Sequence, residues 1–269
     1  MNLQRQCSGR ILVLSLTLLS FGLFGSTHAA ELSARDVAGK LDAVKAELSR
    51  ELTSRLSTNT VRGSYTTVWR QFEDLAIAAL ADLLPRQVPG LTATNFDSRK
   101  AIAGREKNRL ADFVIICGTN TIEISIKAAR AGENPENDMG TFRDHPNREK
   151  LFTASFTVWV RYEDQGEALR AERVFFDRTW RFVGKSALVD GVKYRKKDGN
   201  MRPKPWSMFD SGKAYWQGEE EFELAVKRSE VYRANELVKE YLTDLSEDDQ
   251  KLLHDRLHEK FQRNAPVPR

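Results

Sequence analysis

Cysteine is almost absent from this chain of 269 residues, which contains only Cys7 and Cys117. Two cysteines support neither a disulfide framework nor a cysteine-rich zinc site. Apolar runs of membrane-spanning length are missing as well, because the run at residues 11–24 is too short to cross a bilayer comfortably as a helix. No internal repeat is visible. What remains after these exclusions is an ordinary globular chain, without stable membrane association.

Charge of one sign does not dominate either. The chain has 42 Lys and Arg residues against 38 Asp and Glu residues, a net charge of +4, which indicates a polyanionic partner only weakly. With 41% hydrophobic and 30% charged residues, the composition is typical of a soluble folded protein with enough apolar material for a core. The four histidines include His254 and His258, four apart on a predicted helix. They lack the glutamate that a zincin motif places after its first histidine, so we interpret them as a solvated helix face.

The first thirty residues have the order of a secretory signal peptide. Arg5 and Arg10 precede the apolar run at 11–24, and small residues follow at 26–30. The competing interpretation is a start codon assigned too far upstream, with the protein beginning near Glu31. In either case residues 1–30 are set aside, and residues 31–269 are expected to form a single domain.

The remaining sequence alternates helical and strand patterns. Apolar residues recur at helical spacing over 33–57, and a second helix is predicted at 65–84, ended by Pro85 and Pro89. Strand-forming runs and terminal helices then follow, with strands at 110–117, 121–127, 151–162 and 172–182 and helices over 219–263. A turn at 118–120 joins the first two strands into a hairpin. This order predicts an α/β domain with one central sheet.

The candidate chemistry lies on that hairpin. Residues 121–127 alternate between apolar and polar side chains, so Glu123, Ser125 and Lys127 are expected to share one face of the strand. Asp112, on the preceding strand, would lie beside this polar row. Two carboxylates and a lysine suit a Mg²⁺ site whose shell is completed by substrate phosphate. The alternation is also compatible with a simple amphipathic strand whose polar face is solvated.

Ala111-Asp112-Phe113, followed by Ile124-Ser125-Ile126-Lys127, resembles the signature of the PD-(D/E)XK nuclease superfamily. The similarity is to its type II restriction endonucleases, of the EcoRV-like kind. Glu73 on the second predicted helix resembles the family's helical glutamate, and residues 173–180 resemble the strand that leads to its DNA-recognition loop. The resemblance spans roughly residues 65–190 and implies a restriction-endonuclease-like fold, a central mixed β-sheet flanked by helices.

Two positions depart from the family pattern. Ala111 replaces the usual proline, which the chemistry tolerates because the aspartate carries it. Ser125 occupies the place of the second acid. Glu123, on the same face, is the first candidate to replace that acid, and Glu73 is the second. The resemblance therefore implies Asp112, Glu123 and Lys127 as catalytic residues, with Asp112, Glu123 and Glu73 as ligands of Mg²⁺.

Basic residues cluster after the catalytic hairpin. Clustered lysine and arginine side chains neutralise phosphates, while arginine and asparagine can contact base edges. The predicted DNA-binding residues are Lys185, Lys193, Arg195, Lys196, Lys197, Asn200, Arg202 and Lys204. The alternative interpretation is a solvated loop. The expected organisation is N-terminal helices 33–84, a catalytic core 105–182, a DNA-recognition segment 184–216 and C-terminal helices 219–263.

Together these features predict a Mg²⁺-dependent type II restriction endonuclease that hydrolyses phosphodiester bonds of double-stranded DNA. A cytoplasmic homodimer is expected, with the amphipathic helices of 33–84 as the candidate interface. Two alternatives stay open. One is a non-catalytic DNA-binding protein of the same fold, because Ser125 replaces an acid. The other is a repair nuclease or, if residues 1–30 are a true signal, an exported one.

Overall fold

A computed structural model describes residues 33–62, 65–88, 91–94, 112–117, 120–140, 155–165 and 168–263. The signal-like segment 1–30 and the expected turn residues Gly118 and Thr119 lie outside the described residues. Two helices come first, α1 (Ala34–Ser57) and α2 (Tyr65–Gln87). Five strands follow: β1 (Thr92–Thr94), β2 (Phe113–Cys117), β3 (Asn120–Arg130), β4 (Ser155–Gln165) and β5 (Ala168–Arg178). The other helices within the described residues are α5 (Thr179–Phe182), α6 (Trp206–Asp210), α7 (Glu219–Thr243) and α8 (Glu247–Arg263).

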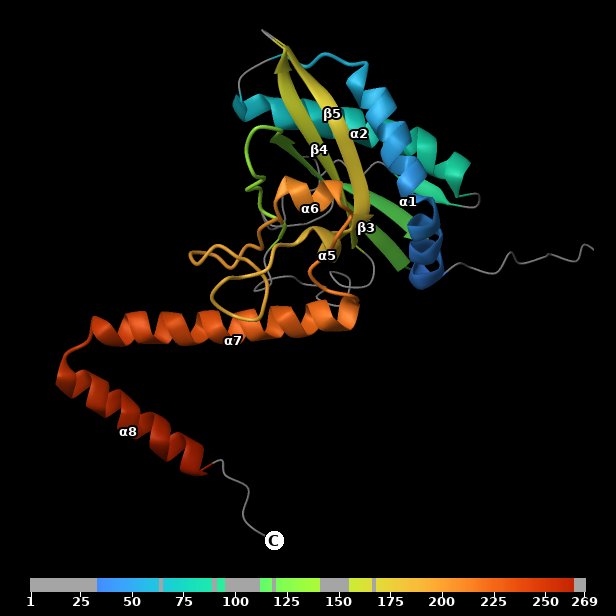
Figure 1. Cartoon of the computed structure of the whole chain (residues 1–269). Helices are drawn as coiled ribbons and strands as arrows, with labels where there is room; N and C mark the ends of the chain where they lie inside the picture. The colour runs from blue at the N-terminus through green and yellow to red at the C-terminus, as the bar shows by residue number, and fades with distance from the viewer. Residues whose placement is uncertain are drawn as a thin grey trace, which may run out of the picture. The chain divides into compact units, whose positions relative to one another are not determined.

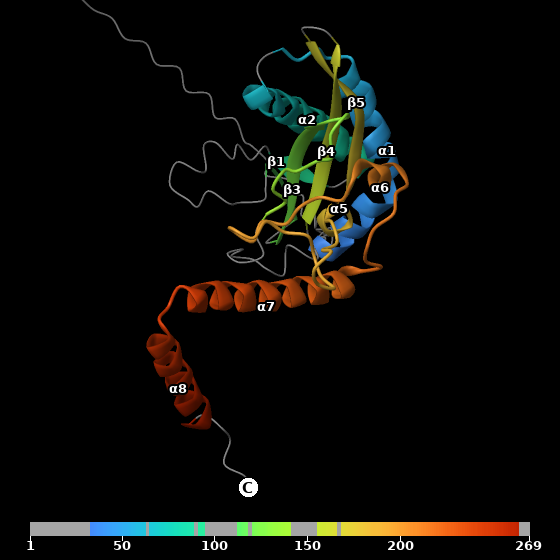
Figure 2. The same cartoon turned by 60° about the vertical axis from the view of Figure 1, so that its left-hand side comes forward.

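The strands form one mixed sheet in the order β1-β2-β3-β4-β5. Neighbouring strands are antiparallel except β3 and β4, which are parallel and therefore need a crossover connection, residues 131–154. Helices α1 and α2 lie together beside the sheet, while α5 and α6 lie on its other side (Figures 1 and 2). The prediction of an α/β domain with a central mixed sheet flanked by helices is confirmed.

Alternation along the strands gives the sheet two different faces. Ile122, Ile124 and Ile126 of β3 point into a core cluster that contains the buried residues of α1 and α2. Trp159 of β4 and Phe175 of β5 belong to a second cluster, which is completed by residues of α5, α6, α7 and the segment between them. Because side chains alternate along a strand, the polar residues Glu123, Ser125 and Lys127 lie on the face opposite the three isoleucines.

Helix α1 begins where the sequence predicts. Ser33 is its N-cap, and a capping box with Asp36 satisfies the first free backbone N–H groups. Leu41, Leu48 and Leu52 are fully buried against the sheet and α2. Amphipathicity in 33–84 is thus explained by the chain's own core. Amphipathicity alone therefore no longer indicates a dimer interface in these helices, since most of their described apolar side chains are buried in that core, with Trp69 an exception at 41% exposed.

The second helix runs past its predicted end. Pro85 lies inside α2, and Val88 N–H donates to the Leu84 carbonyl at 2.9 Å. A proline costs the helix one backbone hydrogen bond. Burial of Leu84 and Val88 compensates for that loss at the last turn.

The strand predicted at 172–182 also differs from the structure. Strand β5 ends at Arg178, and residues 179–182 form the helical turn α5. Trp180 and Phe182 are buried in the second core cluster, so their apolar character serves a helical turn rather than a strand. Strand β3 continues to Arg130, three residues beyond the predicted end at Lys127.

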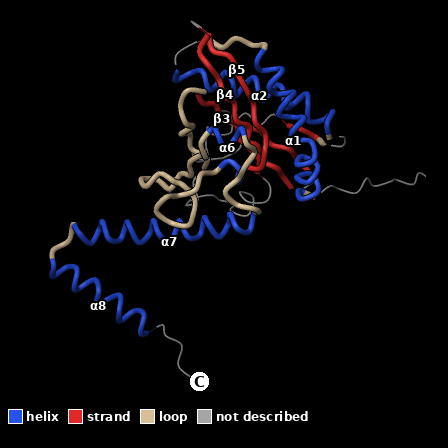
Figure 3. The backbone as a smooth tube through the Cα atoms, viewed as in Figure 1, coloured by secondary structure: helices blue, strands red, loops and turns tan. Residues whose placement is uncertain are grey.

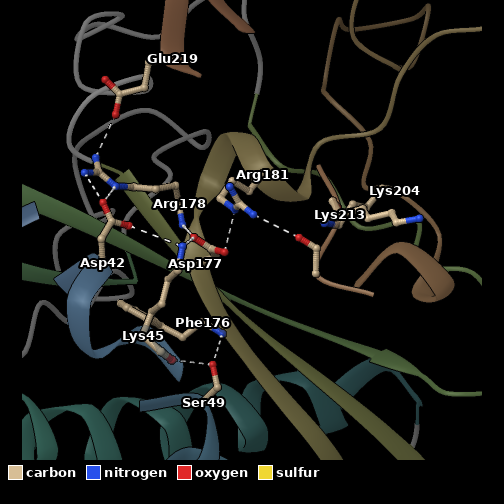
Figure 4. Close-up of polar contacts among 11 residues, drawn as sticks. Asp42, Lys45, Ser49, Phe176, Asp177, Arg178, Arg181, Lys204, Lys213 and Glu219 are labelled. Atoms are coloured by element: carbon tan, nitrogen blue, oxygen red, sulfur yellow. Dashed lines mark hydrogen bonds and ion pairs between the residues drawn. The ribbon is translucent and has the colours of Figure 1, made fainter. Parts of the chain in front are cut away.

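At the end of β5, a network of ion pairs joins helices that lie on the two faces of the sheet (Figure 4). Arg178 contacts Asp42 of α1 at 2.7 Å and Glu219 of α7 at 3.1 Å. Asp177 binds Lys45 of α1 at 2.9 Å and Arg181 of α5 at 2.8 Å. The charged end of β5 therefore links helices from opposite faces of the sheet. None of the helices that the structure describes is long and apolar enough to cross a membrane.

Candidate active site

The hairpin of β2 and β3 brings the candidate residues to one face of the sheet. Phe113 pairs with Ile124, and the N–H of Asp112 donates to the Ile124 carbonyl at 3.0 Å. Asp112 therefore stands at the start of β2, opposite the middle of β3. The pairing arises because each strand carries apolar residues for the same core cluster, which sets the register.

The Asp112 carboxylate is held by three groups of β3. Its Oδ2 accepts a hydrogen bond from the Ile126 N–H at 2.6 Å and another from the Ser125 hydroxyl at 3.2 Å. The Lys127 Nζ lies 3.9 Å from the same oxygen. The side chains of Asp112 and Lys127 are 15% and 23% exposed, so the pair is sheltered yet reachable from solvent. The structure thus brings Asp112 and Lys127 together, as expected.

Ser125 has a contact that sequence reasoning did not assign. Its side chain is buried, 3% exposed, and its hydroxyl is directed at Asp112. Here the residue that replaces the second acid orients the first one. The alternation of residues 121–127 was the available signal, because it places Ser125 on the same face as Lys127.

The two candidate substitute acids lie in different places. Glu123 is half-buried on β3, two residues before Ser125. Glu73 is buried on α2, whose core residues pack on the opposite face, against Ile122 and Ile124. Within the described ranges, no three His, Cys, Asp or Glu side chains are grouped as for a metal site. The structure does not bring Asp112, Glu123 and Glu73 into one such group.

The donor set nevertheless fits a sparsely ligated Mg²⁺ ion. This ion commonly uses one or two protein carboxylates, and waters and substrate phosphates complete its shell. Asp112 engages Ile126 and Ser125 through one oxygen, Oδ2. Glu123 adds a second carboxylate on the same strand face. Asp112 and Glu123 are the carboxylates that this face of the hairpin offers to such an ion.

Several predicted DNA-binding residues are engaged within the chain. Asp138 contacts Arg195 at 3.0 Å, the Asn200 amide at 3.1 Å and Arg202 at 2.9 Å. Lys204 is 3% exposed, and its ammonium donates to the Lys213 carbonyl at 2.5 Å. This differs from the expectation for Lys204, because a buried ammonium that lies over the Phe182 and Phe209 rings cannot reach a DNA backbone.

The other four predicted cations lie at the surface. Lys185 pairs with Asp190 at 2.9 Å, and Lys196 pairs with Glu240 at 3.0 Å. Lys193 and Lys197 are exposed, and neither forms an ion pair within the part of the chain that the structure describes. The exposed positive charge of residues 184–216 therefore comes chiefly from lysines, while the arginines stabilise the segment.

Comparison with known proteins gives a structural likeness and no sequence match. No protein-family model matches the chain, and no curated protein matches it. Among solved structures, the chain is similar to the NlaIV restriction endonuclease, with 14% sequence identity and a TM-score of 0.45. The alignment covers 76% of this chain and 81% of that protein. At this identity the likeness concerns the arrangement of helices and strands, not the residues of the site.

Proposed function

We propose that this protein is a Mg²⁺-dependent endonuclease that hydrolyses phosphodiester bonds in double-stranded DNA. The observation that carries the proposal is the pair formed by the Asp112 carboxylate and the Lys127 ammonium, 3.9 Å apart on adjacent strands. Such a pair offers a hard anionic ligand beside a cation, which is what attack on a metal-bound phosphate requires.

Each residue of the site has its own proposed role. Bound Mg²⁺ would supply charge neutralisation at the phosphate and a more acidic water. Asp112 would hold the metal, and Glu123 would provide a further carboxylate. Ser125 and the Ile126 N–H fix the direction of the Asp112 carboxylate. Lys127, as an ammonium, would orient the attacking water, stabilise the hydroxide left when that water loses its proton to solvent, and offset the negative charge that develops on the phosphate oxygens.

The finer assignment is a type II restriction endonuclease of the PD-(D/E)XK superfamily, EcoRV-like, which acts as a cytoplasmic homodimer. It is supported by Ala111-Asp112-Phe113 and by Ile124-Ser125-Ile126-Lys127. The exposed Lys193 and Lys197 favour contacts with DNA phosphates, which do not depend on base sequence.

A plasmid cleavage assay tests this function. Purified protein should cut plasmid DNA with Mg²⁺ and fail to do so with EDTA. Discrete fragments favour a restriction enzyme, and a smear favours a nuclease without site preference.

The second candidate is a DNA-binding protein of the same fold that does not cut. One observation favours it: the residue in place of the second acid is a buried serine turned toward Asp112. DNA binding without cleavage at any Mg²⁺ or Mn²⁺ concentration would select this candidate over the enzyme.

A further inference from the structure

A cavity of about 640 Å³ lies between the segment 184–205 and helix α7. Its size falls within the range of pockets that bind small molecules. Three tyrosines line it, Tyr194, Tyr215 and Tyr232. Four lysines line it as well, Lys185, Lys193, Lys196 and Lys204. The hydrolysis assigned to Asp112 and Lys127 uses none of these side chains, although Lys193 is also a proposed contact for DNA phosphates.

The cavity wall is fixed to α7 by specific hydrogen bonds. The Ser229 hydroxyl accepts from the Val192 N–H at 2.9 Å, and Arg233 donates to the carbonyls of Lys196 and Lys197 at 3.0 and 3.2 Å. Ser229 and Arg233 are buried. A wall held in this way keeps its shape before a ligand arrives, which lowers the entropic cost of binding.

The Asp138 contacts fix the same segment to the loop that follows β3. Arg195, Asn200 and Arg202 converge on Asp138, in the loop that leaves β3 and also supplies Asn134 and Pro135 to the cavity. These contacts use arginine and asparagine side chains for structure. Among the lining lysines, Lys185 pairs with Asp190, Lys196 pairs with Glu240, and Lys204 is buried. Lys193 is therefore the lining cation best placed to face a ligand.

The lining combines flat aromatic surface with positive charge. Tyr215 is 37% exposed, and Lys193 is exposed without an ion pair among the described residues. Aromatic rings stack on nucleobases with little dependence on sequence, and a lysine ammonium is a compact partner for phosphate. Glu236 also lines the cavity and offers an acceptor for an exocyclic amino group.

We infer that this cavity binds a nucleotide, with its base against the tyrosine rings and its phosphate beside Lys193. The nucleotide is either free in solution or turned out of a DNA strand. The second source rests on the proposed function, because it requires bound DNA. Binding of a free nucleotide does not require DNA, so this inference and the proposed endonuclease function can fail separately.

Calorimetric titration of the full chain in EDTA tests the inference without any cleavage. The probes are deoxyadenosine and deoxycytidine monophosphate, with deoxyadenosine and inorganic phosphate as partial ligands. We expect the monophosphates to bind more tightly than either partial ligand. Lys193→Ala and Tyr215→Ala should each weaken binding roughly tenfold.

Matched controls lie on α7 outside the cavity. Lys227 is exposed and pairs with Glu223, and Tyr241 is 64% exposed. Lys227→Ala and Tyr241→Ala should leave the affinity unchanged. Ala187→Trp, at an exposed lining position, should fill the cavity and block binding. Absence of monophosphate binding, or equal losses in the control variants, would overturn the inference.

A fluorescent duplex then identifies the source. When 2-aminopurine in a bound duplex is turned out of the stack, its fluorescence rises, because neighbouring bases no longer quench it. A rise that Tyr215→Ala reduces assigns the cavity to a nucleotide of DNA. Monophosphate binding without that rise assigns it to a free nucleotide.

Discussion

At the scale of single residues, the main chain sets the direction of the Asp112 carboxylate. A backbone N–H at 2.6 Å and a buried hydroxyl at 3.2 Å bind the same oxygen, so the side chain has little freedom to turn. Preorganised polar groups of this kind stabilise a transition state most when charge develops close to them. The site is therefore sensitive to substitutions that leave the fold intact.

Asp112→Ala and Lys127→Ala should each abolish cleavage and leave DNA affinity largely intact. In the proposed mechanism both act on the reacting phosphate, whereas affinity comes mainly from other cationic contacts. Plasmid cleavage and gel-shift titration of the same preparations measure the two effects. Lys227→Ala, which removes an exposed lysine of α7, is the matched control. Full cutting activity in either site variant would contradict the assignment.

Glu123→Ala and Ser125→Ala separate a metal ligand from a positioning residue. The first should lower the cleavage rate by orders of magnitude, because it removes a hard anionic ligand. Ser125→Ala should lower the cleavage rate only about tenfold, since Asp112 keeps its hydrogen bond from the Ile126 N–H. Raising the Mg²⁺ concentration should restore part of the activity of Glu123→Ala. Normal cutting by Glu123→Ala beside an inactive Glu73→Ala would transfer the ligand role to α2.

Burial lowers the pKa of Lys204 from 10.5 to about 8, while nearby Arg181 adds a smaller effect in the same direction. The unfolded chain therefore holds this proton more tightly than the folded chain. The free energy of unfolding should rise as the pH increases from about 8 to about 10.4. Urea unfolding at several pH values should show this rise in the native chain and a smaller one in Lys204→Met. Lys227→Met, at an exposed site, should keep the full rise.

At the scale of elements, the segment from Val183 to Pro205 has little regular secondary structure and depends on contacts with its neighbours (Figure 3). Isolated bridges pair Lys185 with Val192 and Tyr194 with Met201. Close approach to α7 occurs at Gly191, where an added Cβ would lie 2.3 Å from the Ser229 hydroxyl and 2.8 Å from the Ala225 carbonyl. The position requires glycine for lack of space.

Gly191→Ala should lower the free energy of unfolding by about 1–3 kcal/mol, because the backbone at α7 must shift. Gly39→Ala is the control with the opposite sign. It lies exposed inside α1 with nothing within 4 Å of the added Cβ, so it should stabilise the chain by about 0.5–1 kcal/mol. Denaturant unfolding of both variants measures the difference. Equal stability of the two would show that the segment does not pack on α7 in this way.

At the scale of the whole molecule, two core clusters lie on the two faces of one sheet. The described core begins at Val37, and the proposed site begins at Asp112. The described core and the proposed site both lie within residues 33–263, so removal of the signal-like segment gives a direct test.

A chain shortened to begin at Glu31 should unfold at the same denaturant concentration and cut DNA at the same rate as the full-length form. The described core and the proposed catalytic pair are both retained. Fractionation of the native host then locates the protein. Full-length protein in the cytosol agrees with a restriction enzyme, whereas a shortened form outside the cytosol would contradict that role and favour an exported nuclease.

Local pattern was sufficient for most of the elements. Helical spacing of Leu41, Leu48 and Leu52 predicted α1, and alternation over residues 121–127 predicted which side chains of β3 enter the core. Both depend on the fixed periods of helix and strand, so neighbouring residues determine them. The pairing of Asp112 with Lys127 followed from the same alternation and one short turn.

Tertiary contacts decided the features that the local sequence pattern did not predict. Pro85 remains helical because Leu84 and Val88 are buried, and residues 179–182 leave the strand because Trp180 and Phe182 belong to the second core. Ser125 contacts Asp112, Lys204 is buried, and Asp138 binds three polar residues. Each of these features joins separate segments of the chain. Sequence determined which residue types were present along each element. Only the tertiary structure decided which charges meet a partner, because pairing depends on distances that no local pattern specifies.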